Sequence, residues 1–489
     1  MENTTENKII IRSLIYKFME RTGYQGVAFL VQIILARLLS PSDYGIISML
    51  TIFITVSQVF VQSGLNTALI QKKEADEEDF SSVFYISLTV AIILYGLLFV
   101  ASPIISEFYN MPELKNVLRV LALVLIPGAY NSIQNAKIAR EMQFKKLMYS
   151  TMGAVCISGI VGIGLAFTGA GVWALVAQQI VNQLAICLIL FKVVKWHPCL
   201  KYSFYKVKTL FDFGWKLLCS SLIDTIYTNL QSLVIGKKYN ATMLGYFNRG
   251  KQFPQLLVEN INGSIQSIML PTLSRHQDDK ERMKAMMRKS IVTSSFVLFP
   301  ILVGLAVVAK PLVSIVLTDK WLPCVPYIWI YCFNYAFMPI HTANLQAINA
   351  QGRSDEFLRL ELIKKSYGII ILFISVVCFE SPIAIALGMS CTTIISCFVN
   401  AQPNKRMLNY RYIEQLKDIL PSAVLAFVMG GVVYGISYLQ LSDFVTIILQ
   451  VLVGILIYIS LAKVCKIEAY EYMISVLGKF RKKFIFKMN

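Results

Sequence analysis

Most of this chain consists of apolar stretches that are long enough to cross a lipid bilayer, separated by short polar segments. A membrane-spanning helix needs about 20 consecutive, mainly apolar residues. The pattern therefore predicts an all-α polytopic membrane protein with about 14 transmembrane helices and no soluble domain. The predicted spans are 10–38, 45–70, 81–103, 117–139, 147–167, 172–194, 211–235, 246–270, 290–317, 326–349, 360–380, 382–400, 419–438 and 443–463.

Composition agrees with this pattern and adds an orientation. Hydrophobic residues make up 56% of the chain, and its mean hydropathy is +0.61. About 36 of the 46 Lys and Arg residues fall in loops on one side of the predicted spans. The positive-inside rule makes that side cytoplasmic and places both termini there. The net charge of +18 follows from this asymmetry, so we expect no nucleic-acid partner.

Catalytic signatures are absent from the sequence. It contains no GxSxG, HExxH or Walker motif, and no loop exceeds about 25 residues. The ten cysteines show no pairing or metal-ligand spacing and are interpreted as small apolar fillers. We therefore expect a protein that is not an enzyme and has no cofactor and no metal site.

An internal repeat relates the two halves of the chain. At a shift of 200 residues the first two spans fall on the seventh and eighth, with Gly45 on Gly245. At a shift of 212 the fourth span falls on the tenth, with Pro127 on Pro339. Matched spans run in the same direction, which predicts two six-helix lobes related by a pseudo-two-fold axis along the membrane normal. The predicted parts are 1–195 and 196–404 for the lobes, 405–465 for two additional helices, and 466–489 for a basic amphipathic cytoplasmic tail.

Polar residues recur at helical spacing along four of the spans. The eighth span carries the fullest stripe, and the first, second and seventh spans carry similar ones. Such groups need water or one another inside a membrane, so they indicate either a hydrated lumen, which we favour, or hydrogen bonds between helices. The stripes consist of Gln252, Gln255, Glu259, Asn262 and Gln266; Thr51, Thr55, Gln58, Gln62 and Asn66; Lys17, Arg21, Gln25 and Gln32; and Ser220, Asp224, Tyr227 and Gln231.

Charged residues within the spans give the sharper prediction, because a charge at the bilayer centre costs on the order of 3 kcal/mol. Asp224 in the seventh span and Glu259 in the eighth fall near mid-membrane by residue count. Arg21 lies between the cytoplasmic end and the centre of the first span, and Arg249 and Lys251 enter the eighth span from the outer side. The functional interpretation is a cationic cavity for an anionic head group, with one carboxylate binding a proton or Na⁺. The alternative is a structural ion pair such as Arg21 with Asp224.

Three further features have local interpretations. His341 in the tenth span could titrate near neutral pH, but a hydrogen-bonded core residue is the commoner role. The acidic run from Glu74 to Asp79 is expected to cap the third helix. The tail from Lys466 to Asn489 is expected to form an amphipathic helix on the membrane surface.

Six short motifs follow one another at the ends of the predicted spans. They are Leu38-Leu39-Ser40-Pro41-Ser42-Asp43-Tyr44-Gly45, Ala139-Arg140-Glu141-Met142-Gln143-Phe144-Lys145-Lys146, Ile235-Gly236-Lys237 with Leu244-Gly245-Tyr246, Leu270-Pro271-Thr272-Leu273-Ser274-Arg275 with Asp279-Lys280-Glu281-Arg282, Lys320-Trp321-Leu322-Pro323, and Gln351-Gly352-Arg353-Ser354-Asp355. Together they resemble the motifs of the bacterial polysaccharide exporters, or oligosaccharide flippases, and the resemblance covers roughly residues 10–410. This family belongs to the multidrug/oligosaccharidyl-lipid/polysaccharide transporter superfamily.

The resemblance implies a flippase that works by alternating access. Its substrate would be an undecaprenyl-pyrophosphate-linked oligosaccharide repeat unit, moved from the cytoplasmic to the outer leaflet of the bacterial cytoplasmic membrane for O-antigen, capsule or exopolysaccharide synthesis. Its partners would include membrane lipid. The resemblance does not decide whether transport is coupled to H⁺ or Na⁺, or whether the protein associates with the polymerase and chain-length machinery.

Site roles follow from position in the spans rather than from a motif. Arg21, Arg249 and Lys251 would hold phosphate or acidic sugars, and Asp224 or Glu259 would bind a coupling cation. Two alternatives remain: a cation-coupled multidrug-type extruder, and a membrane polysaccharide polymerase or ligase. The residues expected to meet sugar hydroxyls or to line the lumen beside them are Gln25, Gln58, Gln62, Gln255, Asn262 and Gln266.

Overall fold

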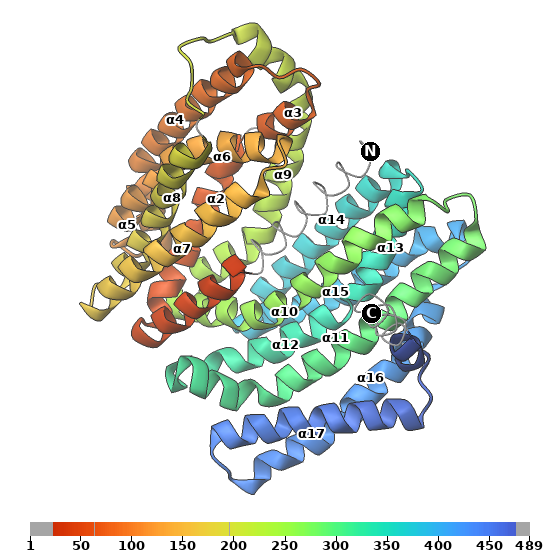
Figure 1. Ribbon diagram of the computed structural model, residues 1–489. Helices are drawn as coiled ribbons and strands as arrows, with labels where there is room; N and C mark the ends of the chain where they lie inside the picture. Colours follow the sequence, from red (N-terminus) through yellow and green to blue (C-terminus); the bar gives the residue numbers. More distant parts are fainter. Residues whose placement is uncertain (1–22, 63, 195, 476–489) are drawn as a thin grey trace, which may run out of the picture. The chain divides into compact units, whose positions relative to one another are not determined.

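A computed structural model describes residues 23–62, 64–194 and 196–475, and all regular structure in these ranges is helical (Figure 1). The chain divides into two compact units, Met1–Gly245 and Tyr246–Asn489. The first unit contains Gly23–Leu38, α2 (Pro41–Gln62), α3 (Leu65–Gln71), α4 (Glu77–Tyr109), α5 (Leu114–Leu121), η1 (Ala122–Val124), α6 (Leu125–Arg140), α7 (Phe144–Phe167), α8 (Val172–Val194), α9 (Phe204–Lys238) and the start of α10 (Ala241–Ser274). The second contains the rest of α10, α11 (Lys280–Leu317), η2 (Asp319–Cys324), α12 (Val325–Ala336), α13 (Met338–Ala350), α14 (Ser354–Cys378), α15 (Pro382–Met407), α16 (Tyr412–Gly435), η3 (Ile436–Leu439) and α17 (Asp443–Val464).

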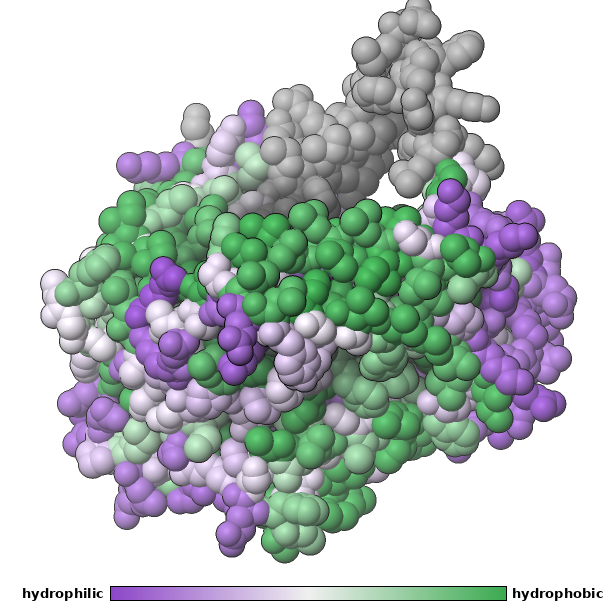
Figure 2. Space-filling model, turned by 90° about the horizontal axis from the view of Figure 1, so that it is seen from below, coloured by the Kyte–Doolittle hydropathy of each residue, from purple (hydrophilic) through white to green (hydrophobic). Residues whose placement is uncertain are grey.

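Nine helical segments in the described part of the chain are long and apolar enough to cross a membrane. The segments α9, α10 and α14 are not among these nine, because polar and charged residues interrupt their apolar runs. The all-α membrane architecture is therefore confirmed, whereas the count of fourteen spans stays a prediction. Figure 2 shows a broad hydrophobic surface of the kind that faces lipid. Helix α17 is largely exposed in the same way, because only 22% of the residues in its apolar stretch are buried.

Several of the family-like motifs form helix caps and turns. Ser40 and Asp43 cap α2 reciprocally, because the Ser40 amide donates to the Asp43 carboxylate at 2.9 Å and the Asp43 amide donates to the Ser40 hydroxyl at 3.2 Å. Asn240 caps α10 in the same way, through a 2.8 Å bond from the Met243 amide. Asp279 caps α11. These residue types therefore set where helices begin.

The acidic run does cap the third predicted span. Asp76 is the N-cap of α4, and its carboxylate and that of Asp79 form a reciprocal capping box. Lys206 at the start of α9 joins this run by ion pairs to Asp76 at 2.5 Å and Glu78 at 2.6 Å. Buried Asp79 pairs with Lys72 at 2.7 Å. The run therefore fastens the start of α9 to the start of α4.

The fourth and tenth predicted spans are both broken near the prolines that the repeat matches. The 3₁₀ turn η1 separates α5 from α6, and Pro127 lies in the first turn of α6. Phe337 separates α12 from α13, and Pro339 lies in the first turn of α13. Proline lacks an amide hydrogen and suits a first helical turn, which explains why both breaks fall where they do.

The second unit packs α16 and α17 against α11, the longest helix (Figure 1). Three fully buried side chains connect α13, α15 and α16: Asn344 donates to Gln415 at 2.7 Å and accepts from Asn404 at 2.8 Å. Residues 468–475 form a short helix in which Glu468 pairs with Arg288 of α11 at 2.8 Å. The rest of the predicted tail helix lies outside the described residues.

Candidate functional site

The predicted basic and polar stripe of the eighth span lies along α10, within the second unit. Arg249 is buried and donates to the Gln252 side chain at 2.7 Å. Lys251 is half-buried, and its ammonium lies 5.8 Å from the ring centre of Tyr331. Arg249 similarly lies 5.2 Å from the ring centre of Trp321. Both cations are therefore held against aromatic faces by a cation–π interaction.

A glycine places these two cations close to α12. A Cβ built on Gly250 would lie 2.5 Å from the Cβ of Tyr327 and 2.7 Å from the carbonyl oxygen of Cys324. Only glycine permits so close an approach of two backbones. The part of α10 around Gly250 is consequently fixed against η2 and α12, which supply the aromatic rings beside Arg249 and Lys251.

Further along α10 the predicted residues have different environments. Gln255 donates to the exposed Glu259 carboxylate at 2.6 Å. Asn262 is buried and accepts a 2.6 Å bond from Thr342 of α13, so it joins two helices. Gln266 is half-buried. The stripe thus combines polar groups that are available to a ligand with at least one that packs helices together.

The predicted residues of the first unit are spread over three helices. Gln25 is half-buried, Gln62 at the end of α2 is exposed, and Asp224 on α9 is exposed. Arg21 lies outside the described residues, and with it the alternative Arg21–Asp224 ion pair. The site assignments therefore remain predictions, and the cationic part that the structure describes is Arg249 with Lys251.

A polar cavity of about 300 Å³ lies within the first unit, between the helix Gly23–Leu38, α2, α7 and α8. Gln58 of the predicted site and Gln32 of the predicted first-span stripe both line it. Sequence reasoning missed its four remaining amides, Gln178, Gln179, Asn182 and Gln183 of α8. These four occupy positions i, i+1, i+4 and i+5 and so share one helix face, a signal that the sequence did contain.

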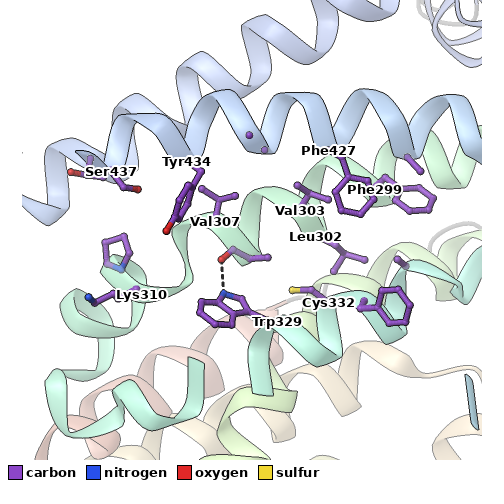
Figure 3. A pocket seen from close by; sticks show the side chains of 18 of the residues that line it. Phe299, Leu302, Val303, Val307, Lys310, Trp329, Cys332, Phe427, Tyr434 and Ser437 are labelled. Atoms are coloured by element: carbon purple, nitrogen blue, oxygen red, sulfur yellow. Dashed lines mark hydrogen bonds between the residues drawn. The ribbon is translucent and has the colours of Figure 1, made fainter. Parts of the chain in front are cut away.

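A second cavity, in the second unit, has an opposite character. It is a groove of about 1230 Å³ between α11, α12 and α16 (Figure 3). Leu302, Val303, Val307 and Phe427 line its length, and polar side chains gather near Lys310 at one end. The apolar length of the groove offers hydrocarbon contact rather than hydrogen bonds, so that part does not suit a sugar.

His341 has the environment of a hydrogen-bonded core residue. Its ring nitrogens lie 3.3 Å from the Cys397 sulfur and 3.0 Å from the Asn400 side-chain nitrogen. Both neighbours belong to α15, so His341 joins α13 to α15. This arrangement agrees with the structural role that the sequence favoured.

Comparisons with known proteins agree on the class of this chain. A family model described as polysaccharide biosynthesis protein matches residues 34–326. The lipopolysaccharide biosynthesis protein WzxC of Escherichia coli K12 is 22% identical over 431 residues, covering 84% of this chain and 85% of that protein. The succinoglycan biosynthesis transport protein ExoT of Rhizobium meliloti is 23% identical over 321 residues, covering 66% and 65%.

A solved structure gives the fold. The lipid II flippase MurJ, in an inward closed conformation, superimposes with a TM-score of 0.74 at 18% identity, covering 95% of this chain and 100% of that one. At this identity the likeness concerns the fold alone. The chain therefore has the two-lobe, all-helical transporter fold that the repeat predicted.

Proposed function

Because the chain belongs to the polysaccharide biosynthesis protein family, we propose that it is a flippase for lipid-linked oligosaccharides. It moves an undecaprenyl-pyrophosphate-linked repeat unit from the cytoplasmic to the outer leaflet of the bacterial cytoplasmic membrane, with both termini in the cytoplasm. The product then serves polysaccharide assembly outside. Like its transporter relatives the protein catalyses no covalent step.

The observation that carries this proposal is the pair of cations at the start of α10. Arg249 and Lys251 lie on one stretch of α10 in a chain built of membrane helices, with Lys251 one turn before Gln255. A pyrophosphate that is linked to lipid at one end and to sugar at the other is a dianion, which two cations with several N–H donors can hold. The amide groups farther along α10 suit the hydroxyl groups of the attached sugars.

The physics of the substrate explains why such a path is needed. The pyrophosphate and the sugars cannot cross the hydrocarbon core unaided. Moving one polar group from water into hydrocarbon without a hydrogen-bond partner costs on the order of several kcal/mol. The polyprenyl chain has no need to leave the membrane. A polar path that is open to lipid along its side lets the head group cross while the chain stays in the bilayer, and two alternately opening lobes prevent a continuous leak.

Arg21, with Arg249 and Lys251, is assigned to the pyrophosphate in this proposal, and Asp224 or Glu259 to a coupling cation, H⁺ or Na⁺. The polymerase and chain-length machinery are the expected partners on the outer side. A polysaccharide polymerase is the alternative of a different class, and it would need a general acid and a base at the glycosidic bond.

A liposome assay tests the proposal. Purified full-length protein is reconstituted with a fluorescent undecaprenyl-pyrophosphate oligosaccharide, and a membrane-impermeant quencher is added outside. We expect quenching well beyond half of the label, and quenching near half for Arg249→Ala. Quenching that stays at half in the wild-type protein, with and without an imposed H⁺ or Na⁺ gradient, contradicts a flippase, and a lengthened or cleaved glycan indicates an enzyme.

A further inference from the structure

The polar cavity of the first unit has an unusual lining for the interior of a membrane protein. Its polar groups are amides and hydroxyls, and the described residues that line it include no Asp, Glu, Lys, Arg or His. Gln58 comes from α2, Ser158 from α7, and Gln178 and Gln179 from α8. All four lie inside their helices rather than at the ends, so the cavity is set within the helical bundle.

Two of the lining amides are fixed by neighbouring helices. Asn182 donates to the Ser158 hydroxyl of α7 at 3.2 Å. Gln183 accepts from the Asn131 side chain of α6 at 2.9 Å. These bonds hold α8 in a fixed rotation against α6 and α7. The same rotation turns the neighbouring Gln178 and Gln179 toward the cavity.

Three amides remain available. Gln58, Gln178 and Gln179 make no side-chain hydrogen bond within the described part of the chain, and each is half-buried. Each amide offers two N–H donors and one carbonyl acceptor. Leaving such groups unpaired away from water is unfavourable, so the cavity must hold either water or a polar ligand.

The chemistry of the lining selects among ligands. The described lining has no charged side chain, so it would neutralise the charge of neither an anionic nor a cationic ligand. An apolar ligand would leave the three amides unpaired. Sugar hydroxyl groups both donate and accept hydrogen bonds, as the amides do, and a cavity of about 300 Å³ is at the lower limit of small-molecule sites, which suits one sugar ring rather than a chain.

We propose that this cavity is a binding site for one uncharged sugar residue of the transported glycan, recognised by Gln58, Gln178 and Gln179. This inference rests on the proposed function and adds a division of labour to it. The first unit recognises a neutral sugar through amides, and the second unit binds the anionic pyrophosphate through Arg249 and Lys251.

Binding is measured with soluble probes and full-length protein in lipid nanodiscs, by saturation-transfer NMR. The probes are the methyl glycosides of glucose, galactose, mannose, rhamnose and N-acetylglucosamine, with methyl glucuronide as the charged comparison. We expect at least one neutral glycoside to bind and the glucuronide not to bind. Each of Gln58→Leu, Gln178→Leu and Gln179→Leu should weaken that binding about 3- to 10-fold. Gln71→Leu, at the exposed end of α3, is the matched control and should have no effect.

A change of specificity provides a second readout. Gln179→Arg introduces a cation among the amides and should admit methyl glucuronide, because a guanidinium binds a carboxylate through two parallel hydrogen bonds. Absence of binding by every neutral glycoside, or equal binding by the three Leu variants and wild type, overturns the proposal and leaves a water-filled cavity.

The liposome assay on the same preparations separates this inference from the proposed function. Flipping by wild-type protein together with no glycoside binding means that the function stands and the sugar site is wrong. Glycoside binding that depends on the three glutamines, together with no flipping, means that the site stands and the flippase proposal is wrong.

Discussion

Gly45 of α2 and Gly245 of α10 meet at one helix crossing in a reciprocal manner. A Cβ built on Gly45 would lie 1.7 Å from the carbonyl oxygen of Ala241. A Cβ built on Gly245 would lie 2.1 Å from the carbonyl oxygen of Pro41. Since Pro41 matches Ala241 at the same shift of 200 residues that matches the two glycines, the contact has the symmetry expected of a two-fold repeat.

Alanine at either glycine should therefore destabilise the protein. Both Cβ positions fall on backbone atoms, which cannot move aside as a flexible side chain can, so the two helices must separate. We expect Gly45→Ala and Gly245→Ala each to cost about 1–3 kcal/mol, seen as a lower midpoint of thermal unfolding in detergent.

Gly96 of α4 is the matched control, because a Cβ there meets nothing within 4 Å. Gly96→Ala should leave the midpoint unchanged or raise it, since alanine favours the helix. Equal midpoints for all three variants would contradict the close crossing.

The success of the repeat shows what one sequence can predict. Gly45, Gly245, Pro127 and Pro339 are each visible in the sequence, because glycine and proline change the backbone at the residue where they stand. The crossing and the two broken spans follow from those local effects. The polar stripe of α10 was likewise predicted from its helical spacing. The burial and the hydrogen-bond partner of each side chain in that stripe were not predicted.

The pH dependence of stability should reveal the Asp76–Lys206 ion pair. The Lys206 ammonium, followed by the Asp79 amide, lowers the pKa of Asp76 from 3.8 to about 2. A lowered pKa contributes stability above the unfolded value of 3.8, and this contribution is lost as the pH falls toward 2. The pKa of Lys206 is raised mainly by its hydrogen bond to Asp76, so its contribution persists up to the unfolded value of 10.5 and is lost above it.

Asp76→Asn tests this directly, because asparagine keeps the helix cap while removing the charge. We expect a small loss of stability, seen as a slightly lower unfolding midpoint, since the pair is exposed to solvent. The difference in unfolding midpoint between variant and wild type should be constant from pH 5 to 9 and should shrink below pH 3.8. A difference that stays constant down to pH 2.5 contradicts the ion pair.

Lys251 should matter for transport and not for folding. Lys251→Gln removes one cation from α10, and losing a hydrogen bond to a charged group costs about 1.5–3 kcal/mol, or at least a tenfold lower flipping rate. Lys463→Gln is the matched control, because Lys463 is exposed at the end of α17. Equal flipping rates for these two variants would refute a role for Lys251 in holding the pyrophosphate.

Coupling should depend on a carboxylate. If Glu259 binds the coupling cation, Glu259→Gln keeps the bond from Gln255 but removes the charge, so an imposed H⁺ or Na⁺ gradient should no longer accelerate flipping. Asp224→Asn is compared in the same liposomes, since only one carboxylate is assigned this role. Gradient-driven flipping that survives in both variants contradicts coupling through either residue.

The missed parts of the structure divide into two kinds. One kind is visible in the sequence, because four amides share one face of the sixth predicted span: Gln178, Gln179, Asn182 and Gln183. The Asn344–Gln415 contact joins residues that are 71 positions apart, and nothing near either residue indicates its partner. A single sequence specifies local backbone and helix faces, whereas the pairing of buried polar groups depends on tertiary packing.

That buried contact gives the last prediction. Asn344→Ala removes the donor to Gln415 and the acceptor from Asn404 while both partners stay buried. Unpaired buried amides cost about 1–3 kcal/mol, so the variant should unfold at a lower temperature. The double variant Asn344→Ala, Gln415→Leu should lose less than the sum of the two single losses, because the second substitution removes a group already left unpaired. Asn260→Ala, exposed on α10, should have little effect. If the stability loss of the double variant equals the sum of the two single losses, the two amides do not interact. In that case α16 is held to α13 by apolar packing alone.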